Sequence, residues 1–165
     1  KMAPGVTAGA QLGASVSVKE RNKIAQLVDD SVTKGAKINV GGKSIEGGGA
    51  FYPATVLTVS KDNPILKQEI FGPVAPIVIT TSDEEAITLA NATEFGLIAY
   101  VYSSDLKRAI RTAEALESGM VAINKGVISD PAAPFGGVKQ SGLGREGGFD
   151  GIHEFLQTKF IGVEI

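Results

Sequence analysis

The fold is decided by residues 74–124, which read VAPIVITTSDEEAITLANATEFGLIAYVYSSDLKRAIRTAEALESGMVAIN. Apolar and often β-branched side chains gather in three short runs of this stretch, a pattern typical of buried strands. The runs predict strands at residues 74–80, 97–102 and 119–124, the first of them buried on both faces.

Two helices are predicted between these strands. Ser82 and Glu85 form a capping box, so a helix should begin at residue 82 and end near residue 92. Asp105 is a suitable N-cap for a second helix, which extends to Glu117 and carries one apolar face. The order strand, helix, strand, helix, strand implies parallel pairing with right-handed crossovers. We therefore expect an α/β fold, an open parallel sheet flanked by helices.

The sequence on either side of this segment adds further elements. Ser17 begins an amphipathic helix over residues 17–34, and Gly35 ends it. The other expected elements are a strand at 37–40, a glycine-rich loop at 45–49, a strand at 51–59, a helical turn at 64–68, a short helix at 148–155 and a strand at 157–165. The last strand has no partner in the sequence order, and an unpaired apolar edge invites another chain.

Composition limits the classes of function. The chain has 165 residues, 43% hydrophobic and 21% charged, as in soluble globular domains. A net charge of −2 gives no general attraction to nucleic acid or anionic membranes. No apolar run approaches the ~20 residues of a membrane span, and the start at Lys1 resembles neither a signal peptide nor a natural beginning. We expect a cytoplasmic protein and a chain that is a fragment.

Cysteine is absent and His153 is the single histidine. These counts exclude disulfides and a thiol nucleophile within this chain, and they argue against a catalytic triad or a transition-metal site. His153 is interpreted as a surface or interface residue, and no metal is expected.

The densest glycine content lies in residues 134–148, which read PFGGVKQSGLGREGG. Six glycines in fifteen residues weaken helix and strand and favour tight turns or close backbone approach. Gly142 to Gly147 match the letters G-x-G-x-x-G, but a dinucleotide fingerprint needs a strand directly before it and a helix directly after it. No strand is predicted directly before it, and no acidic residue follows at a strand end about twenty positions on, so we interpret the stretch as a shaped loop.

A second motif, EIFGPV, covers residues 69–74. The Glu69 carboxylate could accept hydrogen bonds from both hydroxyls of a ribose, and the Phe71 ring could lie against a flat heterocycle. A surface glutamate and a core phenylalanine explain the pattern equally simply. The residues alone leave both interpretations open.

Together the two motifs resemble those of the aldehyde dehydrogenase superfamily. E-x-F-G-P is matched at residues 69–73, and P-F-G-G-x-K-x-S-G-x-G-R-E is matched in full at residues 134–146. The segment NKGVIS at residues 124–129 is most similar to succinate-semialdehyde dehydrogenases within that superfamily.

The resemblance implies roles for five residues. Glu69 would hold the nicotinamide ribose and Phe71 would contact the nicotinamide ring, so NAD or NADP is the expected cofactor. Ser129 would help to hold the substrate carboxylate, and Phe135 would line the substrate tunnel. Glu146 would relay protons from behind the active site. A plain loop serine at 129 and a structural salt bridge at Glu146 remain alternatives.

The superfamily's nucleophilic cysteine would precede Lys1, so no catalytic residue is expected in this chain and the chain alone should be inactive. We expect residues 1–147 to be part of the catalytic domain, and residues 148–165 to be a helix and an oligomerisation strand that builds a homo-oligomer. The parent would oxidise succinate semialdehyde to succinate. The alternatives are a betaine, lactaldehyde or general aldehyde dehydrogenase, and a non-catalytic α/β module that dimerises.

Overall fold

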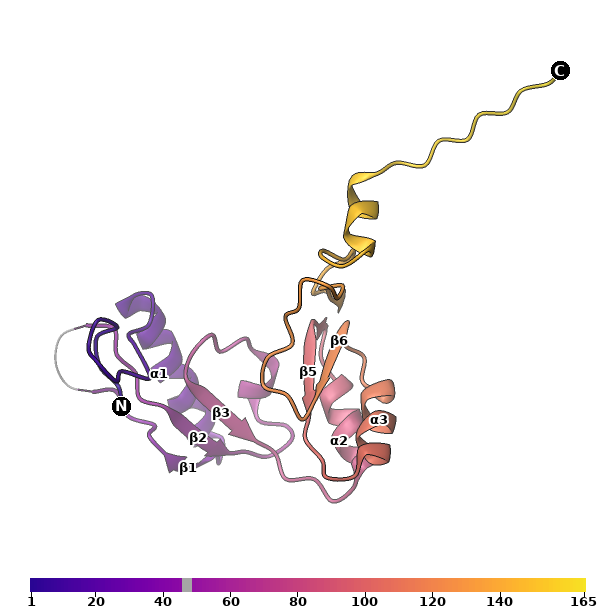
Figure 1. Ribbon diagram of the computed structural model, residues 1–165. Coiled ribbons are helices and arrows are strands. Elements are labelled where there is room, and N and C mark those ends of the chain that lie inside the picture. Colours follow the sequence, from indigo (N-terminus) through magenta and orange to yellow (C-terminus); the bar gives the residue numbers. More distant parts are fainter. Residues whose placement is uncertain (46–48) are drawn as a thin grey trace. The chain divides into compact units, whose positions relative to one another are not determined.

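Residues 1–45 and 49–165 are described by a computed structural model, in which they divide into two units, Lys1–Thr80 and Thr81–Ile165 (Figure 1). No pattern in the sequence predicts this division. The expected glycine-rich loop at 45–49 falls mainly on residues 46–48, which lie outside the described residues.

The first unit combines one long helix with a three-stranded sheet (Figure 1). Its elements in chain order are α1 (Val18–Thr33), β1 (Lys37–Val40), β2 (Thr55–Thr58), the 3₁₀ helix η1 (Pro64–Lys67) and β3 (Val74–Ile77). The central strand β2 pairs antiparallel with β1 and parallel with β3. Helix α1, β2 and η1 share one apolar core, whose largest members are Ile24, Val28, Tyr52, Leu57 and Ile65.

Helix α1 begins and ends where its sequence predicts. The Ser17 hydroxyl accepts a hydrogen bond from the Glu20 backbone N–H at 3.2 Å. At the other end, the Gly35 N–H bonds to Val32 O and the Ala36 N–H bonds to Ser31 O, which is a Schellman motif. Both predicted helix signals are therefore confirmed.

The second unit contains two helices and two pairs of short strands. Strands β5 and β6 are parallel, with Ile98 opposite Met120, as the alternating pattern predicts. Strands β4 and β7 form a short antiparallel pair that the sequence analysis does not predict. The elements are α2 (Asp83–Asn91), β4 (Phe95–Gly96), β5 (Ile98–Val101), α3 (Leu106–Ala115), β6 (Met120–Ile123), β7 (Val138–Lys139) and the 3₁₀ helix η2 (Asp150–Phe155).

The α/β class is confirmed, but the strands lie in three small sheets instead of one open sheet. The named strands have two to four residues each, so each hydrogen-bonded ladder is short. They are also distributed over both units. The predicted strand at 51–59 is reduced to β2, because Pro53 has no N–H to donate to a ladder.

Burial in β3 also differs from the prediction. Val74 packs against the core, whereas Ala75 and Ile77 are exposed, so the strand is covered on one face only. In strands successive side chains point to opposite faces, and the core of this unit lies on one of them.

The predicted terminal strand at 157–165 does not form in the single chain. These residues are exposed and have no regular structure. An extended segment becomes a strand only when a neighbour supplies hydrogen-bond partners, and the prediction assigned that neighbour to a second copy. Its role in assembly stays a prediction. Among the helices of the described residues, none has the length and apolar character of a membrane span.

Candidate active site

The E-x-F-G-P motif lies in a turn between η1 and β3 of the first unit. Asn63 is buried and fixes the beginning of η1, since its side-chain oxygen accepts from the Ile65 N–H and its amide donates to Ser31 O in α1, both at 3.2 Å. Glu69 follows two residues after η1 and is exposed. The segment that leads to Glu69 is thus tied to the core while its carboxylate is open to solvent.

Phe71 is held outward in a strained backbone conformation. Its φ is +48°, in the left-handed region that non-glycine residues seldom adopt, and its side chain is 81% exposed. The interpretation of Phe71 as a core residue is therefore wrong. Residues held in strained backbone conformations cluster at active sites and ligand-binding turns.

The residues after Phe71 explain why the turn keeps this shape. A Cβ on Gly72 would overlap the Cδ1 atom of Ile24, so glycine permits direct contact between the turn and α1. The Pro73 carbonyl accepts from the Thr55 N–H at 2.8 Å, which joins the turn to β2. The contact of Gly72 with α1 and the hydrogen bond of Pro73 to β2 therefore hold Phe71 in its strained conformation.

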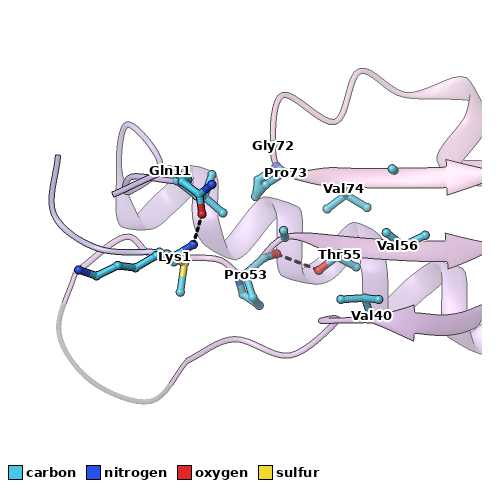
Figure 2. A pocket seen from close by; sticks show the side chains of 13 residues that line it. Lys1, Gln11, Val40, Pro53, Thr55, Val56, Gly72, Pro73 and Val74 are labelled. Atoms are coloured by element: carbon cyan, nitrogen blue, oxygen red, sulfur yellow. Dashed lines mark hydrogen bonds between the residues drawn. The ribbon is translucent and has the colours of Figure 1, made fainter. Parts of the chain in front are cut away.

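An open pocket of about 760 Å³ lies beside this turn (Figure 2). Its apolar walls come from the ends of the three strands and from the first twelve residues, and they include Val40, Pro53, Val56, Pro73 and Val74. Two hydrogen bonds join residues that line the pocket. The α-amino group of Lys1 donates to Gln11 Oε1 at 2.6 Å, and the Thr55 hydroxyl donates to Pro53 O at 2.9 Å (Figure 2). The pocket can accept an apolar group next to Gly72 and Pro73.

The glycine-rich stretch of the second unit forms a loop closed at its base. The Phe135 N–H donates to Glu146 O at 2.7 Å, and the Glu146 N–H donates to Phe135 O at 2.9 Å. Strand β7, of two residues, lies between them, and the helix that follows is the short 3₁₀ helix η2, beginning at Asp150. The arrangement is not a strand followed at once by a helix, so the interpretation as a shaped loop is confirmed.

Close backbone approach holds this loop against the rest of its unit. A Cβ on Gly119 would overlap the Gly136 carbonyl oxygen and lie 2.8 Å from the Gly137 Cα. The Gly96 N–H donates to the Ser141 hydroxyl at 3.0 Å. Glycine at 119 and the serine of the motif therefore place the loop beside β4 and the beginning of β6.

Two charged residues of the motif also hold the loop, and neither role is predicted from the sequence. Arg145 Nη1 donates to Gly137 O and to Gly144 O, each at 2.7 Å, and so joins the two arms. Lys139 Nζ donates to Asn91 O at 2.9 Å and pairs with Glu117 at 2.6 Å. The motif fixes the residue types at Lys139 and Arg145, so these two could have been singled out. The partner of Lys139, Asn91, could not, because it lies 48 positions from Lys139 and no local pattern links the two.

Ser129 lies in the segment between β6 and the loop, and it is exposed. The segment begins at Asn124, whose φ is +53°. The Asn124 side chain accepts from the Ser103 N–H at 2.9 Å and donates to Ser103 O at 2.8 Å, which fixes the turn after β6. The structure thus pairs Phe135 with Glu146 and places Ser129 on the same unit, while Glu69 and Phe71 belong to the other unit.

His153 is exposed in η2, as predicted for a surface residue. Within residues 1–45 and 49–165, no group of three or more potential ligands could hold a metal ion.

A family model described as "Aldehyde dehydrogenase family" matches residues 1–161. The chain belongs to the aldehyde dehydrogenase family. Among curated relatives, succinate-semialdehyde dehydrogenase of Paenarthrobacter nicotinovorans is 51% identical over 160 residues, which are 96% of this chain and 36% of the relative. Glutarate-semialdehyde dehydrogenase of Pseudomonas putida is 44% identical over 165 residues, which are 100% of this chain and 34% of the relative. The chain spans about a third of the length of these relatives.

Solved structures of aldehyde dehydrogenases share the fold. Succinate-semialdehyde dehydrogenase from Burkholderia pseudomallei is 49% identical with a TM-score of 0.88, covering 94% of this chain and 32% of that protein. Betaine aldehyde dehydrogenase from Staphylococcus aureus in complex with NAD⁺ is 39% identical with a TM-score of 0.89, covering 96% of this chain and 33% of that protein.

Proposed function

We propose that this chain is the carboxy-terminal part of an NAD(P)-dependent dehydrogenase that oxidises succinate semialdehyde to succinate. The observation that carries the proposal is the 51% identity to a succinate-semialdehyde dehydrogenase over 96% of the chain. In this reaction the aldehyde and water give a carboxylate, and the nicotinamide cofactor takes up the two electrons as a hydride.

Glu69 and Phe71 are the proposed cofactor residues. Both are exposed, and they stand two positions apart on a turn anchored to α1 and β2. A carboxylate can accept from two ribose hydroxyls, and an outward phenyl ring can support a flat nicotinamide. The residues present therefore fit a nicotinamide nucleotide.

Ser129 and Phe135 are the proposed substrate residues. The Ser129 hydroxyl can donate one hydrogen bond to the distal carboxylate of the semialdehyde. Phe135 is half-buried and offers an apolar wall. Glu146 is the proposed proton relay, and its backbone pairing with Phe135 keeps the two residues at one place on the loop.

The proposed nucleophile is a cysteine outside these 165 residues, which contain none. The chain by itself should therefore not oxidise aldehydes. We assign residues 1–147 to the catalytic domain and residues 148–165 to a helix and an assembly strand. The exposed apolar side chains of the tail, among them Phe160, Ile161 and Val163, support pairing with a second copy in a homo-oligomer.

A steady-state assay tests the proposal. The whole enzyme that carries this sequence is compared on succinate semialdehyde, glutarate semialdehyde and an uncharged aldehyde of similar length, with NAD and with NADP. We expect the highest kcat/KM for succinate semialdehyde and no turnover by the 165-residue chain. A preference for the uncharged aldehyde would contradict the proposed substrate, and turnover by the chain alone would contradict the position of the nucleophile.

A further inference from the structure

Lys139 joins the glycine-rich loop to the ends of two helices. Its Nζ donates to Asn91 O at 2.9 Å and to Thr93 O at 3.2 Å, where α2 ends. The Glu117 carboxylate, just after α3, accepts at 2.6 Å. Three acceptors around one ammonium group satisfy its three donors, and a cation at a helix C-terminus is favourable.

The lysine side of this contact is partly buried, and its two bonds to carbonyls distinguish it from a simple surface ion pair. The Lys139 side chain is 25% exposed, whereas that of Glu117 is 59% exposed. The carbonyls of Asn91 and Thr93 are neutral acceptors that would lack their charged donor without Lys139. Charge-assisted bonds of this kind are stronger than neutral ones.

Asn91 extends the contact into α3. Its side-chain amide donates to Ala115 O and its side-chain oxygen accepts from the Glu117 N–H, both at 2.9 Å. Asn91 therefore accepts from Lys139 through its backbone carbonyl and binds the end of α3 through its side chain. Lys139 is thus bound where the ends of α2 and α3 meet.

Lys139 has a left-handed backbone conformation at a turn in which the Ser141 N–H donates to Val138 O at 3.2 Å. Its φ is +55°, a left-handed value that costs an ordinary residue about 1–2 kcal/mol. Lys139 lies opposite Phe95 in the β4–β7 pair, and Val138 lies opposite Gly96. The arm of the loop that follows Phe135 is thus aligned on β4 while Lys139 reaches the helix ends.

We propose that Lys139 is a positioning residue that fixes the loop and, through its closed base, the places of Phe135 and Glu146. Lys139 lies four residues after Phe135 on the first side of the loop. Arg145, directly before Glu146 on the second side, donates to Gly137 O and so joins the two sides. Loss of the ammonium group releases the residues that follow Phe135 and weakens the two backbone hydrogen bonds between Phe135 and Glu146. The effect on substrate rests on the proposed function, whereas the effect on the loop does not.

Amide hydrogen exchange in the whole enzyme, resolved to single amides by mass spectrometry, tests the loop directly. Lys139→Met keeps the aliphatic stem and removes the charge. We expect exchange of the Phe135 and Glu146 amides to accelerate about tenfold or more. Lys139→Arg should restore slow exchange. Glu117→Gln removes the ion pair but keeps the bonds of Lys139 to the Asn91 and Thr93 carbonyls, so exchange should be intermediate. This variant replaces Lys139→Met in the test if Lys139→Met does not fold.

Arg108→Met is the matched control, because it removes a different ion pair of the same unit, to Asp83, and leaves the loop contacts intact. It should not accelerate the two loop amides. Equal acceleration in Arg108→Met, or unchanged exchange in both Lys139→Met and Glu117→Gln, would overturn the assignment of Lys139.

Kinetics of the whole enzyme supply the functional readout. Lys139→Met should raise KM for succinate semialdehyde about fivefold or more relative to Arg108→Met, with KM for the nicotinamide cofactor unchanged, because Glu69 and Phe71 stand on another unit. An equal rise in both KM values would overturn the positioning role. If the unaltered enzyme does not oxidise the semialdehyde, the proposed function fails, while the exchange result still decides the role of Lys139.

Discussion

Phe135 and Glu146 exchange two backbone hydrogen bonds, at 2.7 and 2.9 Å, across the base of the glycine-rich loop. Residues directly opposite each other in an antiparallel pair project from the same face. A residue proposed to line the substrate path and one proposed to relay protons therefore share one face, although ten residues separate them in sequence. The glycines, Lys139 and Arg145 serve this pairing by closing and anchoring the loop.

The close contact at Gly119 gives a prediction about stability. Gly119→Ala would place a methyl group against the Gly136 carbonyl, so the loop must shift. We expect a loss of about 1–3 kcal/mol in the free energy of unfolding, measured by urea denaturation. Gly126→Ala is the control: its added Cβ would meet nothing nearer than the Tyr102 hydroxyl at 3.7 Å and should change stability little. Equal losses in both variants would contradict the proposed contact.

Tyr52 gives a prediction of the opposite sign. Its side chain is 1% exposed, and its hydroxyl has no hydrogen-bond partner among the described residues. A buried donor without a partner costs free energy, so Tyr52→Phe should leave stability unchanged or raise it by up to about 1 kcal/mol. Tyr100→Phe, at a 47% exposed position, is the control at neutral pH. A loss above about 1 kcal/mol in Tyr52→Phe would show that the hydroxyl is satisfied.

The same residue predicts a dependence on alkaline pH. Burial, and then the charge of Asp29, raise the pKa of Tyr52. The unfolded chain therefore releases this proton at lower pH than the folded chain, and stability should fall as pH rises above about 10. Urea midpoints between pH 8 and 11 should fall less steeply in Tyr52→Phe than in the unaltered chain.

Asp83 gives a prediction at acidic pH. Arg108 Nε donates to Asp83 Oδ2 at 2.6 Å and Nη2 contacts Oδ1, a two-point pair between α2 and α3. These hydrogen bonds, together with the charge of Arg108, hold the pKa of Asp83 below its usual value. The contribution of Asp83 is present above pH ~4 and is lost as pH falls through the lowered pKa.

Urea midpoints between pH 5 and 2 measure this effect. Asp83→Asn should flatten the acid limb of the curve, and high salt should reduce the difference because the pair is exposed. Asp62→Asn is the comparison without the Arg108 pair: the pKa of Asp62 is also lowered, first by the Ser60 hydroxyl, so its acid limb should flatten too but depend less on salt. If the acid limbs of Asp83→Asn and the unaltered chain coincide, the pair contributes nothing to stability.

Local signals in the sequence predict much of this fold. Ser17, Ser82 and Asp105 each accept from a backbone N–H three residues later, so a short window contains all that begins each helix. The parallel β5–β6 pair follows from the order of the elements. Contacts between distant residues could not be predicted in this way. The contact of Lys139 with Asn91 joins β7 to the end of α2 across 48 positions of sequence.

The candidate site shows the same limit. The motifs identify Glu69, Phe71, Phe135 and Glu146, but a pattern of letters does not say whether Phe71 packs inside or points outward. That depends on Gly72 reaching Ile24, a contact between a turn and a helix more than forty residues earlier. The terminal strand is a third case, because its hydrogen-bond partners are not supplied by the fold of one chain.

Phe71 allows backbone strain to be separated from ligand contact. Phe71→Gly should be about 1 kcal/mol more stable than Phe71→Ala, because glycine adopts φ +48° without steric cost. Both variants lose the ring, so both should weaken cofactor binding by about three- to tenfold if the ring supports the nicotinamide. Urea denaturation and titration of the whole enzyme with NAD or NADP measure the two effects. Unchanged affinity in both variants would contradict the role of the ring.

Ser129 tests the recognition of an acidic substrate. A hydroxyl that donates to a carboxylate contributes about 1.5–3 kcal/mol, so Ser129→Ala should raise KM for succinate semialdehyde at least about tenfold in the whole enzyme. KM for an uncharged aldehyde of similar length should not change, because that substrate has no group for the hydroxyl to bind. Ser129→Thr keeps the hydroxyl and should recover most of the affinity. If Ser129→Ala changes both KM values equally, or neither, Ser129 is a loop serine without a part in binding the carboxylate, and the preference for an acidic aldehyde must come from other residues.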